Sequence, residues 1–563
     1  MRKIYLAYLA TAFGSVIPGH ADAAPTMVID VTPSAIDPAS QTGELTVEMT
    51  VPDLELGKGE ILASLGLGMP SQARLHRVKS MSARDRQGMI PLQEKPGMVS
   101  EWAATRAVSG DVTIRYTLAL ESIPMLQGGP PTAVRIDGEA FSGIGEVLFA
   151  RPNLTMPVEI RVNWHLGQMP KGAQAVTSFG DGNIVLPVGP PDRLGHAVYM
   201  VGPVSREPTD GAIDGFSSVW ADDPGFDPRP IMRWTGQLHS WMSDFFGDET
   251  PPPYRVFMRY NPMNAGGGAA LYNSFLVTYG TNVTGESLKN ILGHEMTHTW
   301  TANGLGKWYS EGNAVYYQAL LPWRAGLLTT DEYLAHVNET ASRYYTNLLN
   351  KTPEEEAVRR FWEDTRVRVL PYDRGAMYFA RLNGMIHRAS NGARSIDDLV
   401  LEMVGRAKQG LPITDEIWFD MLRRDSGEEG VALHKAMLAG QLVVPESGDF
   451  GPCFRRTTRM IRRFDVGFDF ASLIGAEKVV RGVKPDSEAA KGGLGEGDHF
   501  NYGVALDAVQ GDVTRMFTLQ VTRDGKITPI TYLPRGEAVE TYQWERDPAV
   551  LENVCRKPAR SAE

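Results

Sequence analysis

The spacing of apolar residues changes along the chain and divides it into three regions. Between residues 24 and 205, apolar residues alternate with polar ones, most clearly in 45–51, 112–120 and 158–166. A period of two is typical of strands with one buried face. Turns rich in glycine and proline, such as 128–131, separate these segments. We therefore expect an N-terminal antiparallel β-saddle or β-sandwich.

Between residues 206 and 445 the pattern becomes that of amphipathic helices. Two strands are expected first, at 254–260 and 274–279. The expected helices span 287–302, 313–321, 331–349, 375–389, 395–407 and 414–422. Thr330 precedes Asp331 and Glu332 and is expected to cap the third of these helices, because acidic residues favour a helix N-terminus. The sequence thus predicts a mainly helical second domain.

Short strands return between residues 446 and 545. We expect strands at 466–470, 518–525 and 527–533, in a small third domain. The last residues, 546–563, are charged and are expected to form a loose tail apart from Cys555. The whole pattern predicts a multidomain α+β fold.

The first 23 residues are expected to be a signal peptide rather than part of the fold. Arg2 and Lys3 precede a mostly apolar stretch, 4–17, and Ala21-Asp22-Ala23 fits the small-x-small cleavage pattern. A membrane anchor is the alternative, but the apolar stretch is short beside the roughly 20 residues of a spanning helix. We expect a secreted or periplasmic protein with no membrane span after cleavage.

Composition and charge narrow the classes of partner. Lys and Arg number 56 against 67 Asp and Glu, which gives a formal net charge of −11. No nucleic-acid partner is expected, because that binding needs a concentrated basic surface. The chain has two cysteines, Cys453 and Cys555. They flank the predicted third domain, so a disulfide is favoured over two buried thiols in an oxidising compartment.

The strongest chemical signal is His294-Glu295-Met296-Thr297-His298, within the helix expected at 287–302. Residues four apart lie on one helical face, so both imidazoles can bind one ion. A zinc ion there would polarise a water molecule, and Glu295 would remove its proton. The alternative is a pair of surface histidines on an amphipathic helix.

A catalytic zinc needs a third protein ligand, and Glu311 is the candidate. It follows closely and is expected to open the next helix. A helix, a turn and a second helix can return a carboxylate to the two histidines. The alternative is a glutamate that merely favours the helix dipole.

These residues resemble a known family. His294-Glu295-x-x-His298-x-Trp300, followed by Ser310-Glu311-Gly312, resembles the gluzincin metallopeptidases, and most of all the glycyl aminopeptidase family, whose bacterial members carry a C-terminal PDZ domain. The resemblance implies a thermolysin-like catalytic domain. It also implies a zinc held by the two histidines and Glu311. The gap from His298 to Glu311 is shorter than the family usually shows.

Two further segments are similar to the same family. Tyr372-Asp373-Arg374-Gly375 resembles its Tyr-x-x-Gly segment, in which the tyrosine hydroxyl donates to the oxyanion of the tetrahedral intermediate. The alternative is an aromatic core residue at the start of a helix. The segment from Gly266 to Ser274 resembles the glycine-rich segment that precedes the zinc helix.

In the glycine-rich segment, the candidate substrate-binding residues are Gly267, Gly268, Ala269 and Ala270. An extended glycine-rich edge lets a substrate backbone pair as an added strand; a flexible turn is the alternative. Family aminopeptidases carry a glutamate here that binds the substrate amine, and Ala270 stands at that place. No Asp or Glu occurs between residues 261 and 274. The resemblance implies an aminopeptidase, but without that acid we expect endopeptidase-like cleavage with weak preference for a free N-terminus. The alternative is an ordinary aminopeptidase site completed by a distant carboxylate.

Residues 479–498 resemble the core of a PDZ domain, with a strand, a small helix and the turn Gly495-Glu496-Gly497-Asp498. The segment 466–470 would be the strand beside the peptide groove, whereas 501–517 show little of the usual second helix. A peptide ligand and a purely structural role are both open. The function expected is an exported zinc metallopeptidase that acts on peptides or proteins. The rival is a non-catalytic scaffold that uses the PDZ-like domain, and the intact Glu295 argues against it.

Overall fold

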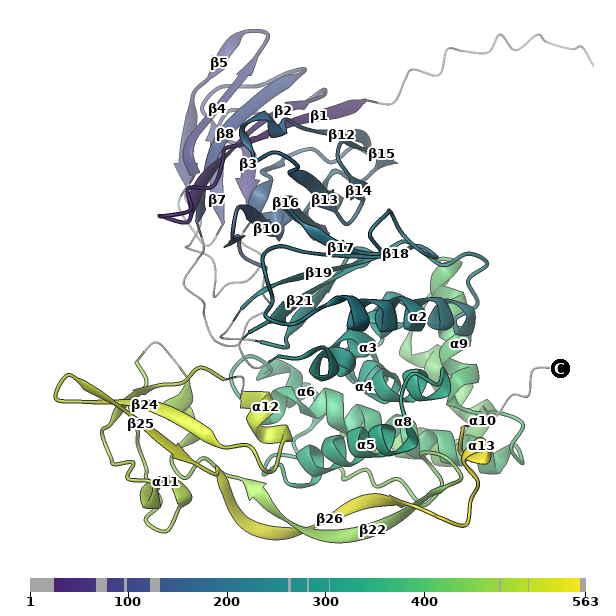
Figure 1. The fold of residues 1–563 in the computed structure, drawn as a ribbon. Helices are drawn as coiled ribbons and strands as arrows, with labels where there is room; N and C mark the ends of the chain where they lie inside the picture. Colours follow the sequence, from purple (N-terminus) through teal and green to yellow (C-terminus); the bar gives the residue numbers. More distant parts are fainter. Residues whose placement is uncertain are drawn as a thin grey trace, which may run out of the picture.

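The computed structural model describes residues 25–66, 78–95, 99–121, 132–261, 265–280, 283–302, 304–474, 477–504 and 506–556. The expected signal peptide, 1–23, and the turn at 128–131 lie outside these ranges. No helix within them is long and apolar enough to cross a membrane. Figure 1 shows a sheet-rich part, a helical part below it and a small lobe beside the helices. The fold is therefore a multidomain α+β fold.

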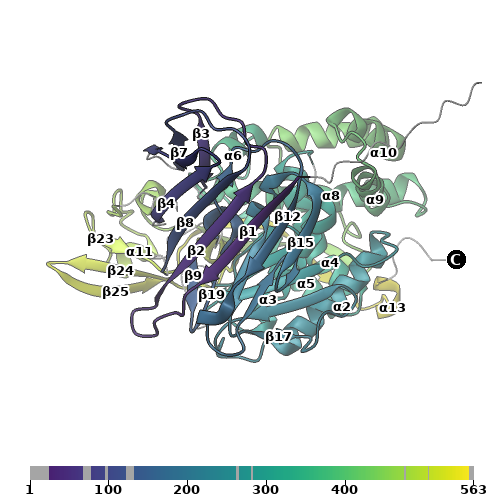
Figure 2. The ribbon, with the colours of Figure 1, turned by 90° about the horizontal axis from the view of Figure 1, so that it is seen from above.

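A large sheet dominates the N-terminal part, and Figure 2 shows its strands side by side from above. In the described residues its order is β15 (Ile184–Gly189), β12 (Val158–Trp164), β1 (Thr26–Pro33), β2 (Thr42–Val51), β8 (Val112–Glu121), β4 (Val78–Asp85) and β5 (Gly88–Ile90). The alternation predicted at 45–51, 112–120 and 158–166 falls in β2, β8 and β12. The sheet is not purely antiparallel, because β1 and β12 run parallel. Strand β12 joins β1 only after the chain has built other sheets, and such crossovers permit parallel pairing.

Two smaller sheets complete this part. One has the order β14 (Gly180–Asp181), β13 (Gln174–Thr177), β16 (Val198–Gly202), β10 (Ala140–Ile144) and β9 (Arg135–Asp137). The other has the order β11 (Arg151–Pro152), β3 (Ile61–Leu65), β7 (Ser100–Ala104) and β6 (Leu92–Lys95). The short helix α1 (Gly145–Leu148) connects β10 to β11. Apolar residues of the three sheets share one core, which includes the fully buried Val47, Ile114 and Val162.

A central sheet joins this part to the helices. Its order is β17 (Ser205–Glu207), β18 (Phe216–Trp220), β19 (Tyr254–Tyr260), β21 (Ser274–Tyr279) and β20 (Gly268–Leu271). The strands predicted at 254–260 and 274–279 are confirmed as β19 and β21. One face of the sheet shares a core with the N-terminal sheets, and the other packs on the helices. Strand β20 lies at the edge of the sheet.

The helical part lies under this sheet in Figure 1. It consists of α2 (Arg229–Phe245), α3 (Gly285–Thr301), α4 (Lys307–Arg324), α5 (Thr330–Tyr345), α6 (Glu354–Arg359), α7 (Thr365–Arg368), α8 (Leu370–Ala389), α9 (Ile396–Lys408) and α10 (Asp415–Leu438). All six predicted helices are present. The predicted cap at Thr330 is wrong by one residue, because the Thr329 side chain accepts the Glu332 backbone N–H while the Glu332 carboxylate accepts from the Thr329 N–H.

The C-terminal lobe (residues 464–535) is carried by a two-stranded ribbon. The ribbon strands are β22 (Phe454–Phe464) and β26 (Arg535–Arg546), which pass beneath the helices in Figure 1. The lobe contains η4 (Phe470–Leu473), α11 (Glu488–Lys491), β23 (His499–Asn501), α12 (Leu506–Gly511), β24 (Phe517–Arg523) and β25 (Lys526–Tyr532). The strands predicted at 518–525 and 527–533 are confirmed as β24 and β25.

Two predictions about the C-terminal region are wrong. Residues 466–470 form no strand although Val466, Phe468 and Phe470 face the core of the lobe, because Gly467 has a φ of 84° and the 3₁₀ helix η4 begins at Phe470. The expected loose tail is packed as far as residue 556. It contains α13 (Glu552–Cys555), and the predicted disulfide between Cys453 and Cys555 is present.

Candidate active site

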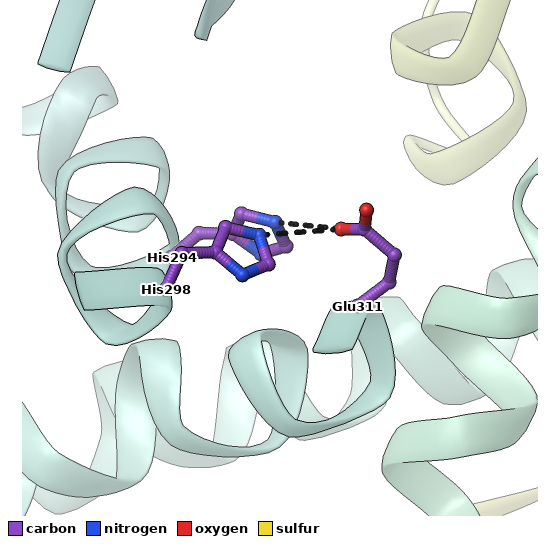
Figure 3. Close-up of side chains that lie close together, drawn as sticks. All are labelled: His294, His298 and Glu311. Atoms are coloured by element: carbon purple, nitrogen blue, oxygen red, sulfur yellow. Dashed lines mark ion pairs between the residues drawn. The ribbon is translucent and has the colours of Figure 1, made fainter. Parts of the chain in front are cut away.

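The two histidines of the motif and Glu311 converge on one point, as Figure 3 shows. His294 and His298 come from successive turns of α3, and their Nε2 atoms lie 3.4 and 3.3 Å from Oε2 of Glu311, which is on α4. The three candidate ligand atoms all lie within 4.8 Å of one another. We call these residues the His–Glu cluster. Its geometry suits the binding of a single metal ion.

Close helix packing sets the distance between the histidines and Glu311. A Cβ atom on Gly293 would lie 2.5 Å from the backbone oxygen of Gln318, so only glycine fits where α3 crosses α4. Gly306, with φ of 101°, starts α4. Glu311 therefore lies one turn inside α4 rather than opening it, which corrects the predicted start at 313. The buried aromatic pair Trp308 and Tyr309 obscures the helical pattern at that start.

A second glycine contact places Tyr372 beside the cluster. A Cβ on Gly312 would lie 2.7 Å from the Cα of Gly375, so α4 and α8 touch at glycine on both helices. The Tyr372 ring consequently stacks on the ring of His294, with centroids 5.8 Å apart and planes 13° apart. Helix α8 begins at Leu370, not at 375 as predicted, so Tyr372 is inside its first turn.

The charges of the site favour an ionised Glu311. Burial opposes ionisation, but hydrogen bonds with His294 and His298 hold the pKa of Glu311 far below its usual range. Burial likewise opposes protonation of His298, yet the carboxylates of Glu311 and Glu295 raise its pKa. An ionised carboxylate is the form that binds metals.

Glu295 and Tyr372 differ from the cluster residues in their roles. Glu295 is half-buried on α3, and its negative charge helps to raise the pKa of both His298 and Tyr372. Burial is the main cause of the raised pKa of Tyr372, followed by the charges of Glu311 and Glu295. The phenol therefore keeps its proton at neutral and mildly alkaline pH and can act as a hydrogen-bond donor.

Gln318 is a site residue that the sequence analysis missed. Its Oε1 lies 3.1 Å from Nδ1 of His294. An amide oxygen can only accept, so His294 donates from Nδ1, which fixes the orientation of the ring and leaves Nε2 on the side of Glu311. The spacing of seven residues from Glu311, two turns along α4, is the signal that could have identified it.

The glycine-rich segment forms the edge strand β20. Gly267 accepts a hydrogen bond from the Thr278 backbone N–H, and Gly268, Ala269 and Ala270 pair with β21. A Cβ on Gly268 would lie 2.0 Å from the Phe275 ring, so packing explains that glycine. Among the described residues no strand pairs with the other side of β20. Strand β20 also packs against α3, which carries the histidines.

The C-terminal lobe reaches the same region. Asp507 of α12 forms an ion pair with Arg368 of α7, 2.5 Å apart, and the Arg366 guanidinium lies 4.0 Å from the ring centroid of Phe470. The Asp507 charge also contributes, after burial and the two glutamates, to the raised pKa of Tyr372. The lobe is therefore packed beside the candidate site.

Neither a protein-family model nor a curated protein sequence matches the chain. Among solved structures, an aminopeptidase N family protein from Idiomarina loihiensis has a TM-score of 0.67 and 14% identity over 94% of this chain and 99% of that chain. An M1 zinc metallopeptidase from Deinococcus radiodurans, solved as a mutant bound to a Tyr-Ser-Ala substrate, has a TM-score of 0.46 and 16% identity over 75% of this chain and 95% of that chain. Yeast LTA4 hydrolase has a TM-score of 0.41 and 12% identity over 75% of this chain and 69% of that chain. The first likeness shows a shared fold.

Proposed function

We propose that the protein is a zinc metallopeptidase of the gluzincin type. The convergence of two imidazole nitrogens and one carboxylate oxygen within 4.8 Å carries this proposal. Two nitrogens and one oxygen are a ligand set typical of catalytic zinc, and three protein ligands leave a coordination position open. The likeness in fold to an aminopeptidase N family protein supports the same reaction class.

Bound at the His–Glu cluster, zinc would polarise a water molecule and the scissile carbonyl. Glu295 would accept the proton of that water and pass it to the departing amine. Tyr372, held protonated by its raised pKa, would donate a hydrogen bond to the oxyanion. Gln318 would hold the His294 ring in the correct tautomer.

The proposed substrates are peptides that add as a strand to the free side of β20. A protonated substrate amine would need a carboxylate near the first subsite, and residues 261–274 contain none. We infer that internal or N-acetylated bonds are cleaved, with weak preference for a free N-terminus. Matched peptides with free and acetylated N-termini test this. A loss of kcat/KM of a hundredfold or more on acetylation would establish an aminopeptidase instead.

We further propose that the protein is exported and that its C-terminal lobe is PDZ-like. The signal-peptide pattern at 1–23 and the disulfide between Cys453 and Cys555 support export. The sheet β23–β24–β25 with α11 and α12 supports a PDZ-like lobe. Because residues 466–470 form no strand, the role proposed for the lobe is packing beside the site rather than capture of a separate peptide.

The decisive experiment removes and restores the metal. The purified protein is treated with a chelator, and hydrolysis of a peptide library is followed by mass spectrometry as zinc is added back. We expect activity to vanish and to return with one zinc per chain. The same titration of His294→Gln should restore nothing, whereas His165→Gln, on an exposed histidine, should behave as wild type. Full activity in the chelator-treated protein would contradict the proposal.

A further inference from the structure

A lysine that the proposed reaction does not use lies against the His–Glu cluster. The Lys307 Nζ atom is 3.9 Å from Oε1 of Glu311 and 4.5 Å from the ring centroid of Phe361. Its side chain is 40% exposed. Within the described residues, Glu311 is its only carboxylate partner within 4.0 Å, and Nζ makes no hydrogen bond. The ammonium is therefore held in place but remains accessible to a ligand.

A continuous series of side-chain contacts connects the Lys307 ammonium to the candidate site. The Phe361 ring that supports Lys307 also stacks near Tyr372, with centroids 6.4 Å apart. Tyr372 in turn stacks on His294, and His294 contacts Glu311. Glu311 turns one oxygen to the histidines and the other to Lys307. The ammonium thus borders the place where the scissile bond would lie.

Among the described residues, the buried acids near Lys307 are engaged by other groups, although the charge of Lys307 also acts on Glu354. Glu311 serves the histidines and the proposed metal, and the neighbouring buried Glu354 is paired with Arg374 at 2.7 Å. A partly exposed positive charge in such a site attracts anions and repels ammonium groups. The glycine-rich segment offers no acid that would reverse this preference.

We propose that Lys307 selects peptides that present a carboxylate close to the scissile bond. This inference rests on the proposed peptidase function and names its substrate class. The carboxylate has two sources with the same chemistry: an acidic side chain that flanks the bond, or the C-terminal carboxylate of a short peptide. Lys307 binds the substrate and takes no part in proton transfer.

The test compares kcat/KM within matched peptide pairs. One set of pairs replaces Glu by Gln on either side of the scissile bond, and another replaces a C-terminal acid by its amide. The zinc-loaded wild type should favour the acid by about tenfold or more in at least one pair at low salt, and the pair that responds identifies the source. The acid-to-amide ratio is the readout, because a general loss of activity cancels in it.

Variants of Lys307 separate charge from structure. In Lys307→Met the ratio should fall to within about twofold of unity, in Lys307→Glu it should invert, and Lys307→Arg should keep the preference. Lys435 is a matched control, since its Nζ also lies over a phenylalanine ring, that of Phe419, at 5.8 Å. Lys435→Met should retain the wild-type ratio.

Two outcomes overturn the inference and are distinguishable from each other. If the wild type hydrolyses acid and amide members of every pair equally, or if Lys307→Met keeps the preference, Lys307 is not a selectivity residue and the peptidase function stands. If the zinc-loaded wild type hydrolyses none of the peptides, the proposed function fails together with the inference.

Discussion

Replacing Tyr372 by Phe would remove one hydroxyl and leave the aromatic packing in place. The ring stacks on His294 and near Phe361, and both contacts need only the ring itself. The hydroxyl makes no hydrogen bond within the described part of the chain, so its loss breaks no internal contact. We therefore expect the Tyr372→Phe variant to fold normally and to bind zinc as the wild type does.

The expected loss is in turnover. A preorganised donor to an oxyanion contributes about 3 kcal/mol, so kcat should fall by roughly 10²–10³-fold. Burial and the nearby glutamates raise the pKa of Tyr372 above its usual value. A raised pKa keeps the proton on the phenol where a free tyrosine would lose it. The wild type should therefore show no loss of rate from this group up to about pH 10, the usual pKa of tyrosine.

The assay measures kcat between pH 6 and 10, zinc content and melting temperature for both proteins. Tyr378→Phe is a control from the same helix, because its hydroxyl contacts Trp418 and His434 in the core. That variant should lose about 1 kcal/mol of stability and little activity. A kcat of Tyr372→Phe within threefold of wild type would refute the oxyanion role, and a loss of zinc would point to a structural one.

Three other predictions concern metal affinity, the disulfide and a buried ion pair. Glu311→Gln should weaken zinc binding at least tenfold in a chelator competition, because the amide lacks the negative charge of the carboxylate ligand. An unchanged zinc affinity would show that a residue other than Glu311 is the third protein ligand. Alkylation without reductant should modify neither Cys453 nor Cys555, and a Cys453→Ser/Cys555→Ser double variant should be destabilised by up to about 4.7 kcal/mol, since the bond closes a loop of 102 residues. Two alkylated thiols in protein from an oxidising compartment would contradict the bond. Asp373→Ala should lower the free energy of unfolding by about 3–5 kcal/mol in a denaturant titration, because it leaves the Arg343 guanidinium without its buried partner. A decrease below about 1 kcal/mol would show that the pair is dispensable.

The sequence predicted what depends on local spacing. The four-residue step from His294 to His298 requires one helical face, and the alternation in β2 and β8 requires one buried face, so both could be read directly. The sequence did not predict the true starts of α4 and α8. Aromatic or buried residues surround both helix starts, so no clear helical period of apolar residues can be recognised there.

Contacts between segments that are distant in the sequence could not be predicted from local residue spacing. Gly312 and Gly375 are recognisable as a pair only once α4 and α8 cross. The Lys307 position over Phe361, the Asp507 pairing with Arg368 and the parallel pairing of β1 with β12 are likewise consequences of tertiary packing. The absence of a strand at 466–470 has a local origin instead, since the backbone at Gly467 has a φ of 84° and a 3₁₀ helix begins at Phe470.

The central claim is that the His–Glu cluster holds zinc while Glu295 moves the proton. Glu295→Gln tests it most directly, because it removes the base and leaves all three proposed ligands intact. Zinc per chain and peptide hydrolysis are measured on the same samples of wild type and variant. The account predicts one zinc per chain in both proteins and hydrolysis only in the wild type. Stoichiometric loss of zinc in the variant, or hydrolysis at the wild-type rate, would contradict it.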